Sequence, residues 1–197
     1  MKAIEQIKGS CIPIPIRDID TDMILPAQYL TSTDSSGYGT FLFKRLRDQS
    51  ADFPLHNPKY QNGSIILAGD NFGCGSSREA AVWALRDAGI RAVIAPSFAD
   101  IFKNNCGKNG ILTIVLPKDA VENLIAMATD SQLGMTIDLN ALTLTVNNEA
   151  LPNSPATFTF TYDQFRRHCL LNGLDDLDYL LSHINDIRAY FSERTIL

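Results

Sequence analysis

A glycine-rich turn contains the residues of this sequence that are best suited to chemistry. It reads Gly73-Cys-Gly-Ser-Ser-Arg-Glu79 and lies between a predicted strand and a predicted helix. Glycines let the backbone approach a ligand closely. The first turn of the helix offers unpaired N–H groups and the positive end of the helix dipole. Because the Arg78 guanidinium can also hold a carboxylate with two hydrogen bonds, the turn is a candidate site for a phosphate or carboxylate.

Helix capping explains the same residues without a ligand. Ser76 and Glu79 have the spacing of a capping box, in which the serine caps the helix and the glutamate reaches back. The two interpretations are compatible, because a capping serine lies where an anion would bind. The pattern excludes a Walker A loop, the dinucleotide-binding fingerprint and the Gly-x-Ser-x-Gly elbow. Ser97 and Asp100 repeat the capping pattern in weaker form, and a structural role is favoured there.

The cysteines and histidines form no ligand cluster along the sequence. The spacing between these residues does not match that of metal ligands. They are Cys11, Cys74, Cys106, Cys169, His56, His168 and His183. A lone cysteine cannot hold an iron–sulfur cluster, so we interpret Cys74 as a small residue in a tight turn. Isolated cysteines also indicate reduced thiols. We therefore expect no metal in this chain.

Length and charge limit the classes of function. The 197 residues suit one domain over residues 1–197. The net charge of -5 argues against nucleic-acid binding, which needs a basic surface. No signal peptide and no apolar run of about 18 residues is present, so no membrane association and a cytoplasmic location are expected.

The elements that must position the turn alternate between strands and helices. Residues 12–16 are predicted to be apolar and extended. Strands are predicted at 64–68, 91–95, 112–116, 136–139, 142–146 and 157–161, and helices at 41–47, 77–85, 97–104, 119–128, 163–171 and 177–191. A loop is predicted at 31–39 and a turn at Asn147-Asn148. The central alternation favours an α/β fold with parallel pairing, and the segment 136–161 adds antiparallel pairing.

Several segments, in this order and spacing, resemble the small subunits of 3-isopropylmalate dehydratase. They are Asp20-Thr-Asp-Met-Ile-Leu-Pro26, Asn71 to Glu79, Val82-Trp-Ala-Leu85, Ile90 to Phe102 and Cys169 to Asp175. The resemblance covers nearly the whole chain. It implies a β/β/α swivelling domain of the aconitase fourth-domain type. It also implies a hydro-lyase of leucine biosynthesis that interconverts 2-isopropylmalate and 3-isopropylmalate by loss and re-addition of water.

The resemblance further implies a heterodimer and roles for individual residues. The large subunit would carry a [4Fe–4S] cluster, and this chain would hold no cofactor. Ser76, as an alkoxide, would remove a proton from the dicarboxylate substrate, helped by Arg78 and the helix N–H groups. Substrate binding is implied for Gly75, Ser77, Thr21 and Asp22. The exposed patch at 74–78 should be buried on assembly, and the lone subunit is expected to be unstable or to self-associate.

Two departures from the family pattern bear on the substrate. The motif Arg-Glu-His-Ala reads Arg78-Glu-Ala-Ala81 here. The loop that chooses the substrate side chain, with Thr31, Ser35, Ser36 and Tyr38, lacks a basic residue that many relatives carry. A paralogous hydro-lyase acting on another 2-alkylmalate, a non-catalytic assembly partner and an unrelated anion-binding module therefore stay open as alternatives.

Overall fold

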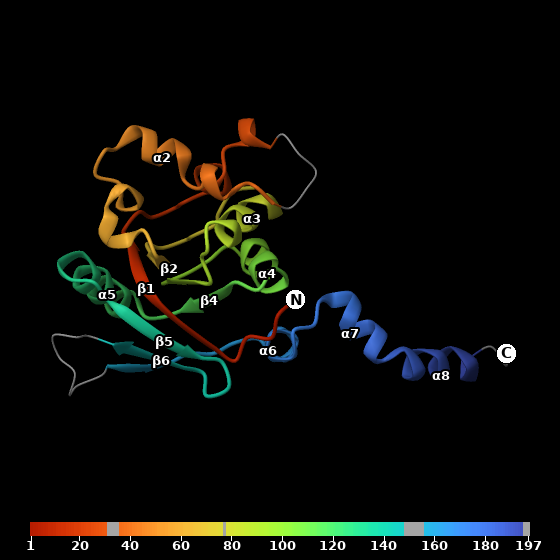
Figure 1. Ribbon diagram of the computed structural model, residues 1–197. Coiled ribbons are helices and arrows are strands. Elements are labelled where there is room, and N and C mark those ends of the chain that lie inside the picture. Colours follow the sequence, from red (N-terminus) through yellow and green to blue (C-terminus); the bar gives the residue numbers. More distant parts are fainter. Residues whose placement is uncertain (31–35, 77, 148–155, 195–197) are drawn as a thin grey trace.

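A seven-stranded mixed sheet forms the centre of the molecule (Figure 1). The computed structural model describes residues 1–30, 36–76, 78–147 and 156–194. The strand order is β4-β3-β2-β1-β5-β6-β7. The strands are β1 (Gln6–Ile14), β2 (Gly63–Ala68), β3 (Ala92–Ala95), β4 (Leu112–Val115), β5 (Gly134–Asp138), β6 (Thr143–Asn147) and β7 (Thr157–Thr159). β1 to β4 pair in parallel, whereas β5 to β7 add an antiparallel half.

The burial pattern of each strand follows from its neighbours. β3 is buried at every residue, and β2 at all but one, because helices cover both faces of the parallel half. β5 and β6 instead alternate between buried and partly exposed residues, as a sheet with one covered face does. The continuous apolar runs and the alternating segments of the sequence therefore mark two different parts of one sheet.

Helices on the two faces of the sheet enclose two cores. The helices are α1 (Thr21–Ile24), α2 (Lys44–Gln49), α3 (Glu79–Asp87), α4 (Asp100–Lys108), α5 (Lys118–Asp130), α6 (Gln164–Asn172), α7 (Asp176–Ser182) and α8 (Ile184–Arg194). α1, α3 and α4 enclose the first core with Phe43 and Phe72. α5 covers the opposite face, where Ile65 and Ile94 point. α7 and α8 extend away from this body (Figure 1) and expose apolar side chains such as Leu177 and Phe191.

Most of the predicted elements are present. The predictions were wrong mainly in the residues at which helices begin. The helix predicted from Ser77 begins at Glu79, and the one predicted from Ser97 begins at Asp100. The helix predicted at 41–47 begins only at Lys44, because Phe43 has a positive φ of 52°. The segment 177–191 forms two helices that meet at His183.

The predicted turn at Asn147-Asn148 is not fully covered by the described residues. Asn147 ends β6, and Asn148 lies outside the described residues. A separate turn joins β5 to β6 and contains Leu142, which has a φ of 54°. In the part of the chain that the structure describes, no helix is long and apolar enough to cross a membrane.

Candidate active site at the carboxyl ends of the parallel strands

Three loops that follow β1, β2 and β3 are joined by backbone hydrogen bonds. The carbonyl of Ile19 accepts from Gly73 N at 2.7 Å and from Cys74 N at 3.2 Å. Thr21 N donates to the carbonyl of Cys74 at 3.0 Å, and Phe72 N donates to that of Ser97 at 3.1 Å. Carboxyl ends of neighbouring parallel strands lie at one edge of the sheet, where α/β proteins commonly bind ligands. The glycine-rich turn is therefore fixed beside the Asp20-Thr-Asp22 segment.

Gly73 allows the turn to pack directly against α4. Its φ is 78°, a conformation that favours glycine, and it is buried. A Cβ at this position would lie 2.1 Å from Cγ of Phe102. The Phe102 ring itself packs edge-on against Phe72, with centroids 5.4 Å apart. Only glycine therefore lets the backbone pass this aromatic pair on its way to Ser76.

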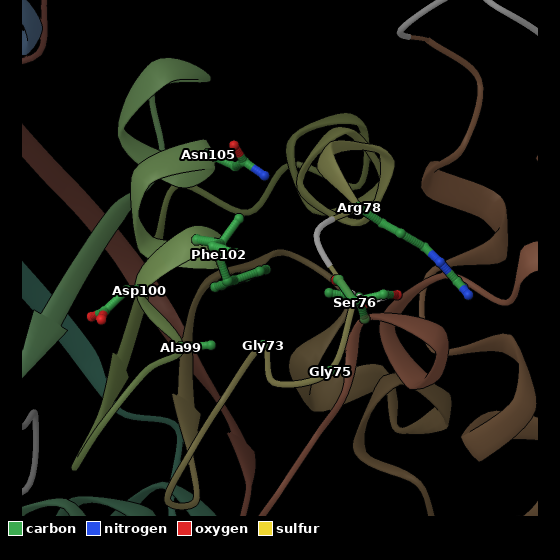
Figure 2. Close-up of a pocket in the computed structure, with 10 residues that line it drawn as sticks. Gly73, Gly75, Ser76, Arg78, Ala99, Asp100, Phe102 and Asn105 are labelled. Carbon is green, nitrogen blue, oxygen red and sulfur yellow. Dashed lines mark hydrogen bonds between the residues drawn. The ribbon is translucent and has the colours of Figure 1, made fainter.

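Ser76 lies at a small cavity and is hydrogen-bonded to Thr21. The Thr21 hydroxyl donates to the Ser76 carbonyl at 2.9 Å, and its Oγ1 lies 3.3 Å from Ser76 Oγ. The cavity has a volume of about 260 Å³ and is lined by Ser76, Phe102 and Asn105, and Figure 2 shows Ser76 across from the two α4 residues. Thr21 is buried whereas Ser76 is exposed. A buried hydroxyl thus contacts an exposed one.

Arg78 is held by an ion pair with Asp22. Its Nη1 donates to Asp22 Oδ1 at 2.7 Å, and in Figure 2 the side chain runs away from Phe102 and Asn105. The other oxygen of the Asp22 carboxylate accepts from Arg45 Nη1 at 3.3 Å. The backbone N–H of Ala27 donates to Oδ1 at 3.0 Å. Two guanidinium groups therefore share one carboxylate, and the cluster has a net positive charge.

These contacts explain the electrostatics of Asp22. The hydrogen bond from Arg78 lowers the pKa of the Asp22 carboxyl below its ordinary value, and the N–H of Ala27 and the charge of Arg45 add to the effect. Asp22 is thus a charged partner of Arg78 at neutral pH. This is a different contact from the direct substrate binding that the resemblance implies for Asp22.

The capping box is wrong, because the chain has not yet entered the helix at Ser76. Gly75 has a φ of 85°, and Arg78 N donates to the Ser76 carbonyl at 2.9 Å, so the chain turns here. The N-cap of α3 is Arg78, without a side-chain cap, and Glu79 accepts instead from Asn109 Nδ2 at 2.8 Å. Ser97 does not cap α4 either, since its hydroxyl donates to Asp70. The hydroxyl groups of both serines therefore make tertiary contacts and do not cap a helix.

The other predicted site residues are not all brought together. Ser77, Thr31 and Ser35 lie outside the described residues. Ser36 is exposed, but Tyr38 is buried in the core with its ring 6.2 Å from that of Trp83. Tyr38 does not line the cavity. Gly75 is exposed, and a Cβ there would lie 3.3 Å from Cβ of Asp20, so the turn approaches this segment closely.

Sequence reasoning missed two contributors to the site. Arg45 comes from α2, 23 residues from its partner Asp22, and no local motif marks it. The start of α4, from Ala99 to Phe102, forms one wall of the cavity with Asn105. Its position could have been inferred, because α4 follows β3 and the site lies at the carboxyl ends of the strands.

Cys74 follows Gly73 in the turn, near the carboxylates of Asp18 and Asp20. Desolvation raises the pKa of its thiol, and the carboxylates of Asp20 and Asp18 raise it further. Within the described residues, no group of three or more His, Cys, Asp or Glu side chains could hold a metal ion. The described residues therefore do not fit an iron–sulfur cluster, which needs three or four ligands.

Comparison with known proteins gives the same fold and family as the resemblance of the sequence segments. Residues 1–119 match the Aconitase C-terminal domain family. The 3-isopropylmalate dehydratase small subunit of Francisella philomiragia subsp. philomiragia is 48% identical over 190 residues, which are 96% of this chain and 97% of the relative. That of Rubrobacter xylanophilus is 44% identical over 195 residues, or 98% and 96% of the two chains.

A solved structure agrees with these sequence relatives. The 3-isopropylmalate dehydratase (leuD) crystal structure from Methanocaldococcus jannaschii matches with a TM-score of 0.62 and 28% identity, over 96% of this chain and 99% of that one. The expected fold class, an α/β domain of the aconitase type, is confirmed. The chain belongs to the family of 3-isopropylmalate dehydratase small subunits.

Proposed function

We propose that this chain is the small subunit of a hydro-lyase that interconverts 2-isopropylmalate and 3-isopropylmalate in leucine biosynthesis. The large subunit would complete the enzyme as a heterodimer. The observation that carries the proposal is the position of Ser76. Ser76 lines the cavity, its hydroxyl lies 3.3 Å from that of Thr21, and it precedes Arg78 by two residues. A serine and an arginine in the same turn support the proposal, because the removal of a proton from a dicarboxylate needs a proton acceptor and a nearby positive charge.

Ser76 is proposed to transfer the proton. As an alkoxide, its oxygen takes the proton from the carbon next to the one that carries the hydroxyl, and it returns the proton in the reverse direction. A serine hydroxyl is too weak an acid for this in water. Hydrogen-bond donors and a site closed to solvent stabilise the alkoxide. Because Ser76 is exposed in this chain, the large subunit has to supply that closure.

Arg78 is proposed to bind a substrate carboxylate while Asp22 holds it in place. Asp22 contacts Nη1, so the other guanidinium nitrogens of Arg78 can still donate to a substrate. Thr21 orients Ser76, Gly75 leaves room at the turn, and Ser77 would add a second contact to the carboxylate. Tyr38 lies in the core, so we assign the choice of substrate side chain to the exposed part of the 31–39 loop.

The [4Fe–4S] cluster is assigned to the large subunit. The described residues of this chain do not provide its ligands, and the relatives are named small subunits, which implies a large partner. This chain then contributes the proton transfer and the carboxylate contact. We propose further that the heterodimer is cytoplasmic, that residues 1–197 form one domain and that the lone subunit self-associates.

The proposal is tested by mixing this chain with a large subunit of the family whose cluster has been reconstituted without oxygen. Formation of the unsaturated diacid from 3-isopropylmalate is followed by ultraviolet absorbance. We expect turnover only when both chains are present, and a loss of at least about a hundredfold in kcat for Ser76→Ala. Ser10→Ala, a serine on β1 outside the cavity, is the matched control and should keep normal turnover.

Three other outcomes are informative. Near-normal turnover by Ser76→Ala would rule out Ser76 as the base. Turnover of another 2-alkylmalate, but not of 3-isopropylmalate, would keep the mechanism and change the substrate. A stable complex without any turnover would make the chain a non-catalytic assembly partner.

A further inference from the structure

A second and larger cavity lies at the opposite end of the parallel strands. It has a volume of about 560 Å³ and is formed by the N-terminal segment that leads into β1, the end of α3, the residue before β3 and the end of α4. In Figure 1 the N-terminus lies beside the end of α4, and a Cβ on Gly110 would be 3.6 Å from Cδ1 of Ile4. The cavity is thus separate from the site around Ser76, with which it shares no lining residue.

The charged side chains that line this cavity all have one sign. They come from four separate segments, and they are Lys2, Lys8, Arg86, Arg91 and Lys108. No aspartate or glutamate lines it, although acidic residues outnumber basic ones, 22 to 17, in the whole chain. The cavity is therefore a concentration of positive charge in an acidic protein.

Neighbouring carboxylates compensate only part of this charge. Arg86 has Asp87 at 3.7 Å, and Lys108 has Asp176 at 3.6 Å, but the same Asp176 carboxylate is bound more closely by Arg166. Among the residues that the structure describes, Lys2, Lys8 and Arg91 form no ion pair. Mutual repulsion of such charges disfavours the folded state unless an anion binds among them.

Stabilisation of helix ends explains the positions of two of the five positively charged side chains, but not those of the other three. Arg86 and Lys108 are in the last turns of α3 and α4, where positive charges interact favourably with the helix dipole. Lys2 and Lys8 come from the segment around β1, and Arg91 directly precedes β3. Helix stabilisation does not account for these three, so their convergence requires another reason.

The cavity also has the shape and floor of a small-molecule site. Its volume falls in the range of ligand pockets, roughly 300–1,000 Å³. Ile4 and Ile7 form an apolar floor, and Ile7 is 6% exposed. Gln6 adds a neutral amide group, whereas the amide of Asn109 is already bonded to Arg86 and Glu79. An apolar floor strengthens charge interactions above it, because fewer water molecules screen them.

We infer that this cavity binds a small anion that carries two or more phosphate or carboxylate groups. A compact polyanion can contact lysines from both sides of the cavity at once, whereas a single chloride cannot. The concave shape favours a small molecule over an acidic segment of the partner subunit. The inference is independent of the function proposed for Ser76.

Calorimetric titration of the full-length chain at low ionic strength tests the inference. Inorganic pyrophosphate and succinate are the two probes, and they distinguish phosphate from carboxylate chemistry. We expect one site per chain for at least one probe. Lys8→Gln combined with Arg91→Gln should weaken its affinity by roughly tenfold, as the loss of two partly exposed ion pairs predicts. Added salt should weaken it as well.

Two control variants locate the binding. Lys103→Gln removes a lysine of α4 that does not line the cavity, and Arg78→Gln removes the arginine of the Ser76 site. Both should bind the probe within about twofold of the unaltered chain. Circular dichroism confirms that each variant is folded. Equal weakening by Lys103→Gln would show a general field effect and overturn the inference, as would binding that depends on Arg78.

Two further results would also overturn it. One is the absence of heat with both probes. The other is probe binding by the lone chain that disappears in the heterodimer, because the cavity would then be a docking site for an acidic segment of the large subunit.

Discussion

Asp22 connects Arg78, the N-cap of α3, with Arg45 of α2, and this positioning role can be tested separately from substrate binding. Asp22→Asn keeps the shape of the side chain but removes the charge that holds Arg78 and Arg45. Arg78 would then sample other positions, and misplacement of a binding group by about an ångström can cost up to roughly a hundredfold in rate. We expect kcat/KM of the heterodimer to fall by about ten- to a hundredfold, with little change in melting temperature.

Steady-state kinetics with 3-isopropylmalate measures this effect. Asp48→Asn is the matched control, since Asp48 forms an ion pair with Lys44 and makes no contact with Arg78. Normal kinetics for Asp22→Asn would show that Arg78 is oriented by the partner subunit instead.

Arg45 brings a second positive charge to a site whose 31–39 loop has no basic residue. Its side chain is 44% exposed, so it can turn towards an incoming carboxylate. Arg45→Gln should raise KM for the diacid by about three- to tenfold, as the loss of a partly exposed ion pair predicts, and leave kcat within about twofold.

The neighbouring Lys44→Gln removes the same charge one residue earlier, from a lysine that pairs with Asp48. We expect it to leave KM unchanged. Kinetics over a range of substrate concentrations separates the two variants. If the two variants raised KM equally, Arg45 would act only through the overall positive charge of α2 and not through a specific contact.

At the scale of elements, the contact between the glycine-rich turn and α4 determines where Ser76 lies. Gly73→Ala would place its Cβ 2.1 Å from the Phe102 ring and would also strain the backbone. We expect a loss of roughly 2–4 kcal/mol in the free energy of unfolding. Gly89→Ala is the matched control, because Gly89 also has a positive φ, of 87°, but a Cβ there meets no atom within 4 Å.

Urea denaturation of the two variants separates strain from overlap. Gly89→Ala should lose only about 1 kcal/mol, the cost of the backbone conformation. A similar loss in both variants would mean that Phe102 moves aside freely and does not position the turn.

The elements themselves were predictable to the extent that burial determines them. β2, β3 and β4 were found from the sequence because strands covered on both faces form continuous apolar runs. The starts of α3 and α4 were predicted too early. Ser76 and Ser97 have the residue types of caps, but their hydroxyl groups contact Thr21 and Asp70 across the fold instead. A tertiary partner of this kind leaves no trace in the local sequence.

The site was predictable where local sequence carries its chemistry. Ser76 and Arg78 stand in one motif, and Thr21 belongs to a second motif that the fold brings to the same edge. Arg45 could not be found in this way, because its partner is 23 residues distant and only the packing of α2 brings them together. Tyr38 was placed in the substrate loop, but its ring packs in the core beside Trp83.

At the scale of the whole molecule, two buried thiols couple stability to alkaline pH. Cys11 in β1 and Cys106 in α4 belong to the two cores on opposite faces of the sheet. Burial raises the pKa of the Cys11 thiol from 9.0 to about 12 and keeps that of Cys106 well above its ordinary value. The folded chain therefore retains protons that the unfolded chain releases above pH 9, and stability falls as the pH rises through this range.

This coupling predicts a slope that the Cys11→Ala variant should reduce. Each buried thiol lowers the free energy of unfolding by up to about 1.4 kcal/mol per pH unit between its unfolded and folded pKa values. Urea denaturation at several pH values from neutral to alkaline measures the slope. Cys11→Ala should be less stable at neutral pH, because its smaller side chain leaves a cavity. Its stability should nevertheless fall less steeply above pH 9. Parallel curves for the two proteins would contradict the prediction, since the Cys11 thiol would then ionise equally in the folded and unfolded chain.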